Sequence, residues 1–188
     1  LESGEVTISR ALHSSTFPAN IMLIAALNPC PCGYRNDPRR ECHCSVTQIE
    51  KYMAKISGPL LDRIDLHLEV PAVPFKELAS PNAGATSETM RAQVVDARSR
   101  QRQRFKQSTH RFNAHMSSKQ IRVHCQLDNA GQHILRASMN ELGLSARAHD
   151  KVLRVARTIA DLDAAESITS AHLNEAINYR MLDRSLWT

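Results

Sequence analysis

The pattern of apolar residues changes once along this 188-residue chain, near residue 72, and this change restricts the fold more than any other feature. Before that point apolar residues alternate with polar ones or form short runs, which indicates strands. Beyond residue 87 they recur every three or four positions, which indicates amphipathic helices. The stretch between is rich in Pro, Ala, Ser, Asn and Gly without periodicity, as a linker is. We therefore expect an α/β part at 1–72, a linker at 73–87 and an all-α part at 88–188.

The α/β part contains several predicted strands and one predicted helix. Residues 6–9 alternate, and the apolar run at 21–27 is typical of a strand buried on both faces. Residues 64–70 alternate as far as Pro71, as a half-buried strand does. A helix is expected at 46–56, ending near Gly58 and Pro59, because these residue types occur at helix ends.

The all-α part contains four predicted helices, at 88–105, 128–142, 146–161 and 170–182. Gly143 closes the second helix. Ser145 and Thr169 stand at the N-cap positions of the next two, where a side-chain oxygen accepts an otherwise unpaired backbone N–H. One face of the 146–161 helix should be core, because its apolar residues repeat at three- and four-residue steps: Ala148, Val152, Val155, Ile159 and Leu162.

The composition, 42% hydrophobic and 23% charged, is that of a soluble globular protein. The longest apolar run is far too short to cross a bilayer, and no charged-then-apolar leader opens the chain. We therefore expect a cytoplasmic protein without a membrane partner. The chain begins at Leu1 instead of a Met and enters a strand-like pattern at once, so we expect further sequence upstream.

The net charge of +5 is concentrated in one stretch. Residues 91–111 contain seven basic residues, among them Arg98 and Arg102, against the single acidic residue Asp96. Such a helix face attracts phosphates, so Arg98 and Arg102 are candidate DNA contacts. A solvated basic helix without a nucleic-acid role carries the same pattern, and charge alone does not separate the two readings.

Four of the five cysteines form two pairs, Cys30-Pro-Cys32 and Cys42-His-Cys44, in a loop rich in Arg, Asp, Pro and Gly. Four thiolates at this spacing can close a tetrahedral zinc site, and we favour zinc. Redox-active thiols and plain reduced cysteines in a cytosolic loop are the alternatives. His43 can replace a ligand, but a solvent-facing histidine is the simpler reading. Cys125 is expected to be a small core residue.

Three polar residues stand at the ends of predicted elements: Asn28 after the apolar run, Arg63 before a strand, and Arg147 in the first turn of a helix. Each is ordinary by itself. A strand-terminal Asn before Pro is usually a turn residue, an Arg before a strand is usually solvated, and an Arg early in a helix opposes the helix dipole.

The sequence blocks around these residues nevertheless resemble the magnesium-chelatase-like branch of AAA+ ATPases, through residues 1–10, 17–23, Asn28-Pro29 and 58–65. Within that branch the chain is most similar to the ComM (YifB) group, through residues 28–33, 57–66 and 145–161. The resemblance runs along nearly the whole chain. It implies an α/β remnant of a AAA+ (P-loop NTPase) core followed by an all-α C-terminal lid bundle.

The resemblance also assigns roles in ATP hydrolysis. Asn28 would be the sensor-1 residue that aligns the attacking water, Arg63 an arginine finger reaching the neighbouring subunit's ATP, and Arg147 the sensor-2 arginine. This agrees with the chemistry, because phosphoryl transfer spreads negative charge that fixed cations and amide dipoles stabilise. Arginine suits the task because it stays charged and its fork matches phosphate oxygens.

The sequence lacks the elements that grip ATP and Mg²⁺. A P-loop ends in Gly-Lys-Ser/Thr, but the residues after the six glycines are Glu, Tyr, Pro, Ala, Gln and Leu. No apolar strand ends in a paired Asp-Glu that could hold Mg²⁺. We expect both elements upstream of Leu1, so that the full-length protein hydrolyses ATP and the 188-residue chain alone does not.

Residues 1–20 would, by the same resemblance, form a hairpin before sensor 1 that points toward a central pore. Arg10 and His13 are then candidate DNA contacts, although an ordinary exposed hairpin fits the residues equally well. Phe17 is the only aromatic residue there, so backbone electrostatics would dominate DNA binding.

We therefore expect the C-terminal part of a AAA+ DNA motor of the ComM type, forming a homo-oligomer, a hexamer by the resemblance. The resemblance connects such motors with branch migration in natural transformation and recombination. A magnesium-chelatase-type ATPase subunit is an alternative that the cysteine loop disfavours. A non-enzymatic, zinc-stabilised nucleic-acid-binding module is a second alternative, and it describes best the chain acting alone.

Overall fold

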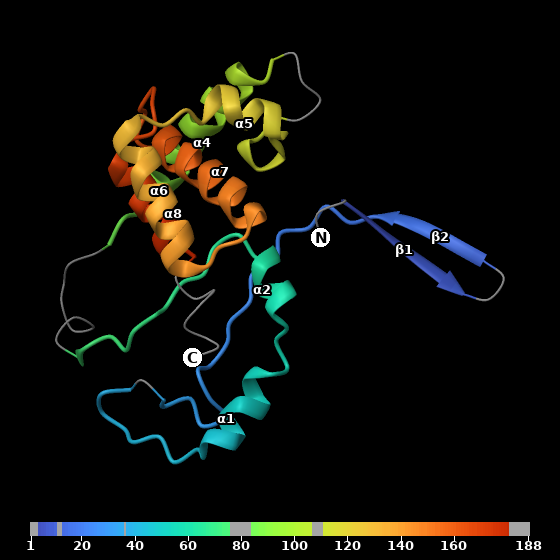
Figure 1. Cartoon of the computed structure of the whole chain (residues 1–188), viewed down its shortest axis with the longest axis vertical. Coiled ribbons are helices and arrows are strands. Elements are labelled where there is room, and N and C mark those ends of the chain that lie inside the picture. The colour runs from blue at the N-terminus through green and yellow to red at the C-terminus, as the bar shows by residue number, and fades with distance from the viewer. Residues whose placement is uncertain (1–3, 11–12, 36, 76–83, 107–110, 181–188) are drawn as a thin grey trace. The chain divides into compact units, whose positions relative to one another are not determined.

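The computed structural model describes residues 4–10, 13–35, 37–75, 84–106 and 111–180. They belong to two compact units, 1–64 and 65–188 (Figure 1). The described residues are mostly helical, with one two-stranded hairpin. Residues 76–83 of the predicted linker lie outside the described residues, so the limits of the linker stay a prediction.

The first unit opens with the expected hairpin. Strands β1 (Glu5–Arg10) and β2 (His13–Pro18) pair antiparallel, with Val6 opposite Phe17 and Arg10 opposite His13. The Ala19 N–H donates to the Gly4 carbonyl at 2.7 Å and closes the base of the hairpin. Every residue of both strands is exposed, so the hairpin has no core of its own.

The prediction of a buried strand at 21–27 is wrong. These residues form no strand, and the side chains of Met22 and Ile24 are 86% and 83% exposed. A strand needs a neighbour for its backbone hydrogen bonds, and the two strands of the described chain pair with each other. The apolar pattern correctly shows side chains suited to burial, but it cannot supply the sheet that would bury them.

The predicted strand at 64–70 is also absent, and burial does not follow its alternating pattern. Leu66 and Leu68, expected to be buried, are exposed, whereas His67 between them is buried. This segment belongs to the second unit, where the His67 N–H donates to the Tyr179 carbonyl at 2.8 Å. Asp65 accepts an ion pair from the buried Lys151 at 3.0 Å. Docking onto helices therefore replaces strand pairing here.

Two short helices complete the first unit. Helix α1 (Val46–Met53) confirms the predicted helix and begins with a capping box between Ser45 and Gln48. Residues 58–59 do not simply end it, because they begin α2 (Gly58–Arg63) with Pro59 in the first turn. Proline is accepted there because the first N–H groups of a helix have no partner within it. Arg63 thus ends a helix instead of preceding a strand.

The second unit is a helical bundle. It contains α4 (Ser87–Arg104), the 3-10 turn η1 (Asn113–His115), α5 (Ser118–His124), α6 (Asn129–Leu142), α7 (Ala146–Leu162) and α8 (Ser170–Asn178). The four predicted helices are confirmed, although residues 181–182 of the last lie outside the described residues. The predicted caps are confirmed as well: Ser145 and Thr169 accept backbone N–H groups, and Gly143 ends α6 with φ 61°.

Helix α7 lies at the centre of this unit and packs against α4, α5 and α8. Four of the five residues predicted on its core face are buried or half-buried, but Leu162 is 43% exposed. Leu162 is the last residue of the helix. Cys125 is buried in the same core, as predicted, and burial raises its pKa to about 11.

A polar network is buried beside this core. The Asp161 carboxylate, 1% exposed, accepts from both terminal nitrogens of Arg104 at 2.7 and 2.5 Å and from the Asn113 amide at 2.8 Å. Arg157 also pairs with this carboxylate, with its Nη2 atom 3.1 Å from the Oδ1 atom of Asp161. Arg104 belongs to the basic stretch found in the sequence, but this ion pair removes it from the solvated face.

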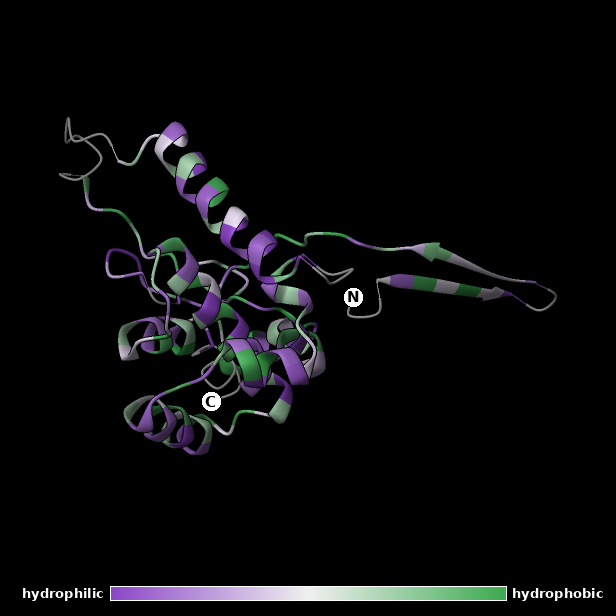
Figure 2. Cartoon of the chain, turned by 90° about the horizontal axis from the view of Figure 1, so that it is seen from above, coloured by the Kyte–Doolittle hydropathy of each residue, from purple (hydrophilic) through white to green (hydrophobic). Residues whose placement is uncertain are grey.

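No helix of the described ranges is both long enough and apolar enough to cross a membrane. The hydropathy colouring agrees with this, since polar residues interrupt the apolar ones along the helices in view (Figure 2).

Candidate functional site

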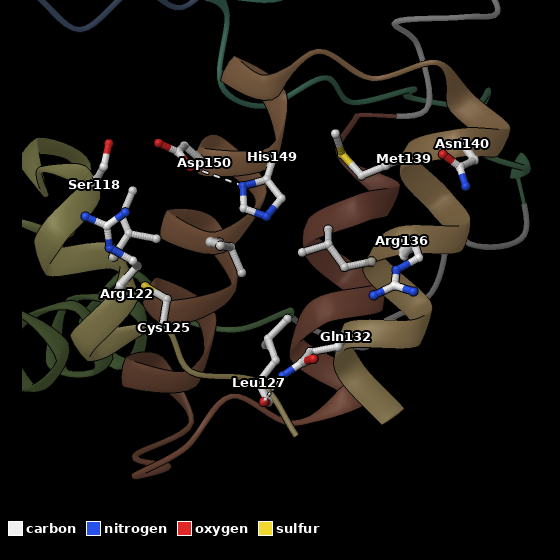
Figure 3. A pocket seen from close by; sticks show the side chains of 13 residues that line it. Ser118, Arg122, Cys125, Leu127, Gln132, Arg136, Met139, Asn140, His149 and Asp150 are labelled. Atoms are coloured by element: carbon white, nitrogen blue, oxygen red, sulfur yellow. Dashed lines mark hydrogen bonds and ion pairs between the residues drawn. The ribbon is translucent and has the colours of Figure 1, made fainter. Parts of the chain in front are cut away.

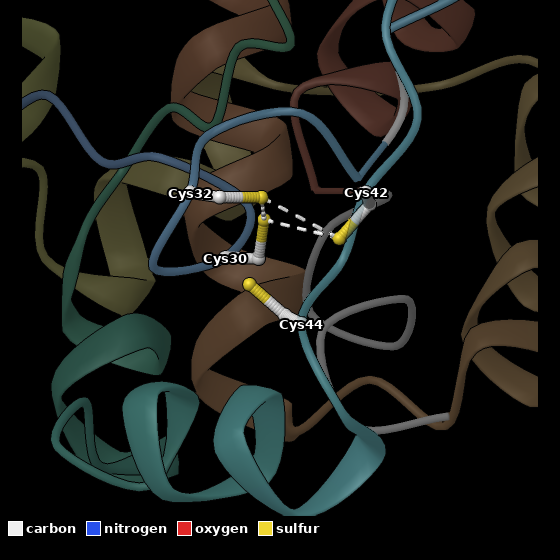
Figure 4. A group of neighbouring side chains, drawn as sticks. All are labelled: Cys30, Cys32, Cys42 and Cys44. Atoms are coloured by element: carbon white, nitrogen blue, oxygen red, sulfur yellow. Dashed lines mark hydrogen bonds between the residues drawn. The ribbon is translucent and has the colours of Figure 1, made fainter.

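The four paired cysteines meet at one point in the first unit (Figure 4). The Sγ atom of Cys30 lies 3.3 Å from that of Cys32 and 3.7 Å from that of Cys42, and the Cys32–Cys42 distance is 3.6 Å. Cys44 supplies the fourth sulfur atom, and all four lie within 4.8 Å of one another. Cys30 is buried, Cys42 and Cys44 are half-buried, and Cys32 is exposed. Four thiols converging in this way can hold a metal ion.

Short-range interactions shape the loop that carries the cysteines. The Gly33 N–H donates to the Cys30 carbonyl at 3.0 Å, and Gly33 has φ 83°, a conformation that strains other residues. Farther along, the Arg40 guanidinium donates to the Tyr34 hydroxyl at 2.7 Å and lies 5.1 Å from the centre of its ring. Ser45, the N-cap of α1, directly follows Cys44 and fixes that end of the loop.

The cysteines of the cluster differ in the direction in which their pKa values are shifted. Burial raises the pKa of Cys30, but hydrogen bonds from Cys32, from Cys42 and from two backbone N–H groups outweigh it and bring this pKa to about 6. The pKa of Cys44 rises to about 12, chiefly through its hydrogen bond with Cys32. The pKa of Cys30 is thus shifted toward the thiolate, the form that binds metal, whereas the pKa values of Cys42 and Cys44 are shifted away from it. A metal ion would displace the remaining protons on binding.

The three residues with predicted roles in ATP hydrolysis lie on separate segments. Asn28 is exposed at the start of the cysteine loop, and Arg63 is exposed at the end of α2, where its Nη1 donates to the Pro59 carbonyl at 2.8 Å. Arg147 is exposed in the first turn of α7, in the second unit. Their predicted roles stay predictions.

The predicted DNA contacts form two small groups. Arg10 and His13 face each other across the hairpin at its closed end, next to residues 11–12, which lie outside the described residues. Arg98 and Arg102 are exposed and four positions apart on α4, so they share one face of the helix. The Arg98 guanidinium lies 4.1 Å above the centre of the Phe112 ring.

A groove in the second unit was not predicted from the sequence. It has a volume of about 640 Å³ and lies between α5, α6 and α7 (Figure 3). Its walls come from helices that are separate in the sequence, so no local motif could have indicated it. The cysteine cluster, in contrast, follows from the spacing of its residues, and the structure confirms that the four side chains gather.

Comparisons with known proteins agree along the chain. A family model described as magnesium chelatase, subunit ChlI, matches residues 1–78, and one described as magnesium chelatase, subunit ChlI C-terminal, matches residues 84–180. The chain is 41% identical over 187 residues to the competence protein ComM of Haemophilus influenzae and 41% identical over 188 residues to YifB of Escherichia coli. An uncharacterized protein of Mycobacterium tuberculosis is 33% identical over 180 residues.

These alignments cover 99%, 99% and 96% of the chain, but only 36%, 36% and 35% of the respective relatives. The chain thus spans about a third of the length of the curated relatives that it matches.

Proposed function

Because the chain belongs to the magnesium chelatase ChlI-like family, with ComM and YifB among its relatives, we propose that it is the C-terminal part of an ATP-dependent AAA+ DNA motor. The motor would act as a ring of identical subunits, a hexamer, and would move DNA junctions during the uptake and recombination of DNA. The observation that carries the proposal is the match of both ChlI family models, which together include Asn28, Arg63 and Arg147.

In this proposal each of the three residues acts on the γ-phosphate of ATP. Asn28 orients the attacking water, Arg147 contacts the phosphates of its own subunit's ATP, and Arg63 reaches the ATP of the neighbouring subunit. The exposure of Arg63 at the end of a helix supports a role across a subunit boundary, because a finger must leave its own surface. A positioned arginine is worth about 10³–10⁵ in rate in related phosphoryl transfers. ATP and Mg²⁺ would be gripped by parts of the full-length protein outside this chain.

The thiol cluster would hold Zn²⁺ through Cys30, Cys32, Cys42 and Cys44. Four thiolates about 2.3 Å from a tetrahedral zinc ion lie about 3.8 Å from one another. The three Sγ–Sγ distances of 3.3, 3.6 and 3.7 Å need only a slight expansion to reach this value. Zinc has no redox chemistry of its own, so it would act by fixing the loop.

Zinc in this loop would also hold Asn28 in place. Asn28 is two positions before Cys30, and a Cβ atom at Gly33 would lie 3.8 Å from the Asn28 side-chain carbon. The amide of Asn28 therefore lies against the turn that the cluster closes. Loss of the metal should loosen Asn28 and slow ATP hydrolysis without removing any ATP contact.

DNA would be contacted by Arg10 and His13 on the hairpin and by Arg98 and Arg102 on α4. A two-stranded hairpin without a packing partner is marginally stable in water, which supports a role in contacting another molecule. The pairing of Arg98 with Phe112 places a cation and an aromatic ring together, a combination found where single strands bind.

The experiment that tests this function is ATP hydrolysis by the full-length protein with and without DNA. The proposal predicts hydrolysis that DNA stimulates and that Arg147→Ala abolishes, while Arg100→Ala, an exposed change elsewhere on the second unit, leaves it intact. Hydrolysis that is indifferent to DNA would contradict a DNA motor and favour the chelatase-type ATPase.

A second candidate applies to the 188-residue chain by itself: a zinc-stabilised nucleic-acid-binding module. The gathering of four thiols in a unit that also carries the hairpin favours it. Titration of the chain with fluorescent single-stranded DNA at several salt concentrations tests this module, because phosphate contacts weaken steeply as salt rises. Absence of binding at low salt would contradict both the module and the DNA contacts of the motor.

A further inference from the structure

The groove between α5, α6 and α7 combines an apolar floor with a basic rim. Ile121, Leu135, Met139 and Leu153 line the floor. Arg122 of α5 and Arg136 of α6 stand on opposite sides of the opening (Figure 3). Neither guanidinium pairs with any residue of the described chain. The groove therefore suits an apolar side chain that is flanked by carboxylates.

The charges within the groove leave it basic. Asp150 is its only acidic lining residue, and Asp150 is paired with His149 at 3.1 Å. Two arginines that face one apolar opening favour an anionic partner. The groove holds about 640 Å³, room for several side chains, and it is open to solvent, which suits a protruding loop.

The second unit carries a surface of the opposite kind at the far end of α7, which we call the acidic knob: Leu162, Asp163 and Glu166. Leu162 is 43% exposed, the Asp163 side chain is 63% exposed, and Glu166 is exposed. An exposed leucine followed in the chain by two exposed acidic residues matches the floor and rim of the groove in polarity and in charge.

The loop that carries the knob is fixed in place. Arg157 donates to the Ala165 carbonyl at 2.6 Å and to the Glu166 carbonyl at 2.7 Å, and the Ala165 N–H donates to the Ala160 carbonyl at 2.8 Å. A loop that is already ordered loses little conformational entropy when it binds.

A subunit cannot fill its own groove with its own knob. His149 lines the groove and Leu162 belongs to the knob, and thirteen positions of one straight helix separate them by about 20 Å. Two complementary surfaces at opposite ends of one element produce a head-to-tail contact, which repeats from subunit to subunit.

We propose that the acidic knob of one copy of this chain inserts into the α5–α7 groove of a second copy, with Leu162 on the apolar floor and Asp163 and Glu166 beside Arg122 and Arg136. This contact would join the subunits of the proposed motor, and it therefore rests on the proposal that the protein forms a homo-oligomer. It requires neither ATP nor DNA.

The test measures self-association of the 188-residue chain by sedimentation equilibrium at concentrations up to about 1 mM, because a contact this small binds weakly. The parent chain should form species larger than a dimer as concentration rises. Arg136→Glu and Glu166→Arg should each weaken association at least about tenfold. Arg100→Glu, the same charge change on the exposed face of α4, should leave association unchanged.

Mixtures make the test specific to a head-to-tail contact. Arg136→Glu keeps the knob and Glu166→Arg keeps the groove, and the changed groove of the first also complements the changed knob of the second. The mixture should therefore form species larger than a dimer at concentrations where neither variant alone associates. The double variant Arg136→Glu/Glu166→Arg should regain the association of the parent. Circular dichroism of each variant should match that of the parent, because both side chains are exposed.

A parent chain that stays monomeric at every concentration would overturn the proposal. So would Arg136→Glu associating like the parent, or a double variant that stays monomeric. These outcomes are separate from failure of the motor, because ATP hydrolysis of the full-length protein is measured independently and could persist with other subunit contacts.

Discussion

Replacement of Asp161 by alanine removes the centre of the buried polar network in the helical unit. Arg157, 3% exposed, would lose its carboxylate partner but keep its two carbonyl acceptors, whereas Arg104, 16% exposed, would lose both contacts to Asp161. Removal of one partner from a buried ion pair costs about 3–5 kcal/mol, so we expect about 4 kcal/mol here. For a unit of this size that corresponds to a fall in Tm of about 15 °C.

Thermal unfolding followed by far-UV circular dichroism measures this fall. The matched control is Asp163→Ala, the same substitution two positions away on a side chain that is 63% exposed and paired with His172. Because contacts of a largely exposed carboxylate contribute about 0–1 kcal/mol, the control should lower the Tm by only a few degrees. Equal, small effects of the two substitutions would refute the reasoning, since burial would then not distinguish them.

The same network makes the free energy of unfolding depend on pH. Burial would raise the pKa of Asp161, but hydrogen bonds from Arg104 and Asn113 and the charges of Arg104 and Arg157 hold it below the ordinary value of 3.8. The unfolded chain therefore binds this proton more readily than the folded chain does. The stabilisation by Asp161 is complete above about pH 4 and is lost as the pH falls through the lower, folded-state pKa. The Asp161→Ala variant should lack this loss.

Three further predictions concern the metal, DNA and ATP. Metal analysis of the chain purified under reducing conditions should give about one zinc per chain. Cys44→Ser should remove this zinc, whereas Cys125→Ser, in the bundle core, should retain it. A value near zero in the parent would contradict the site. Arg98→Glu/Arg102→Glu should weaken single-stranded DNA binding and reduce the slope of log affinity against log salt concentration by about 0.7 for each lost phosphate contact. Lys119→Glu on α5 should leave both unchanged. An unchanged slope in the α4 variant would show that α4 is not part of the DNA interface. The chain alone should not hydrolyse ATP, because it has no P-loop, and turnover that Arg63→Ala abolishes would contradict this.

Features that depend on neighbouring residues could be predicted from the sequence. The helices at 128–142 and 146–161 and their caps at Ser145 and Gly143 follow from local patterns, and the structure has them within one or two residues. The two cysteine pairs likewise indicate their own cluster, because only nine residues separate them. Helix α5 was missed because seven residues are too few to establish a period.

Features that depend on distant residues could not be predicted. The apolar run at 21–27 looks like a buried strand, but burial requires a sheet that the run does not itself encode. Arg104 looks like one more exposed arginine in a basic stretch, and only the fold brings it to Asp161, 57 positions away. The groove is invisible in the sequence for the same reason, since Arg122, Arg136 and Leu153 come from three helices.

Arg63 acting on the ATP of a neighbouring subunit is the central claim, and mixing two inactive variants of the full-length protein tests it most directly. Arg63→Ala and Asn28→Ala should each abolish hydrolysis while ATP still binds. In a mixed ring, a site is complete where an Arg63→Ala subunit meets the intact Arg63 of an Asn28→Ala neighbour, about one site in four with random mixing of equal amounts. We predict that about a quarter of the parent activity returns on mixing. Two inactive variants that stay inactive when mixed in verified mixed rings, or an Arg63→Ala protein as active as the parent, would contradict the account.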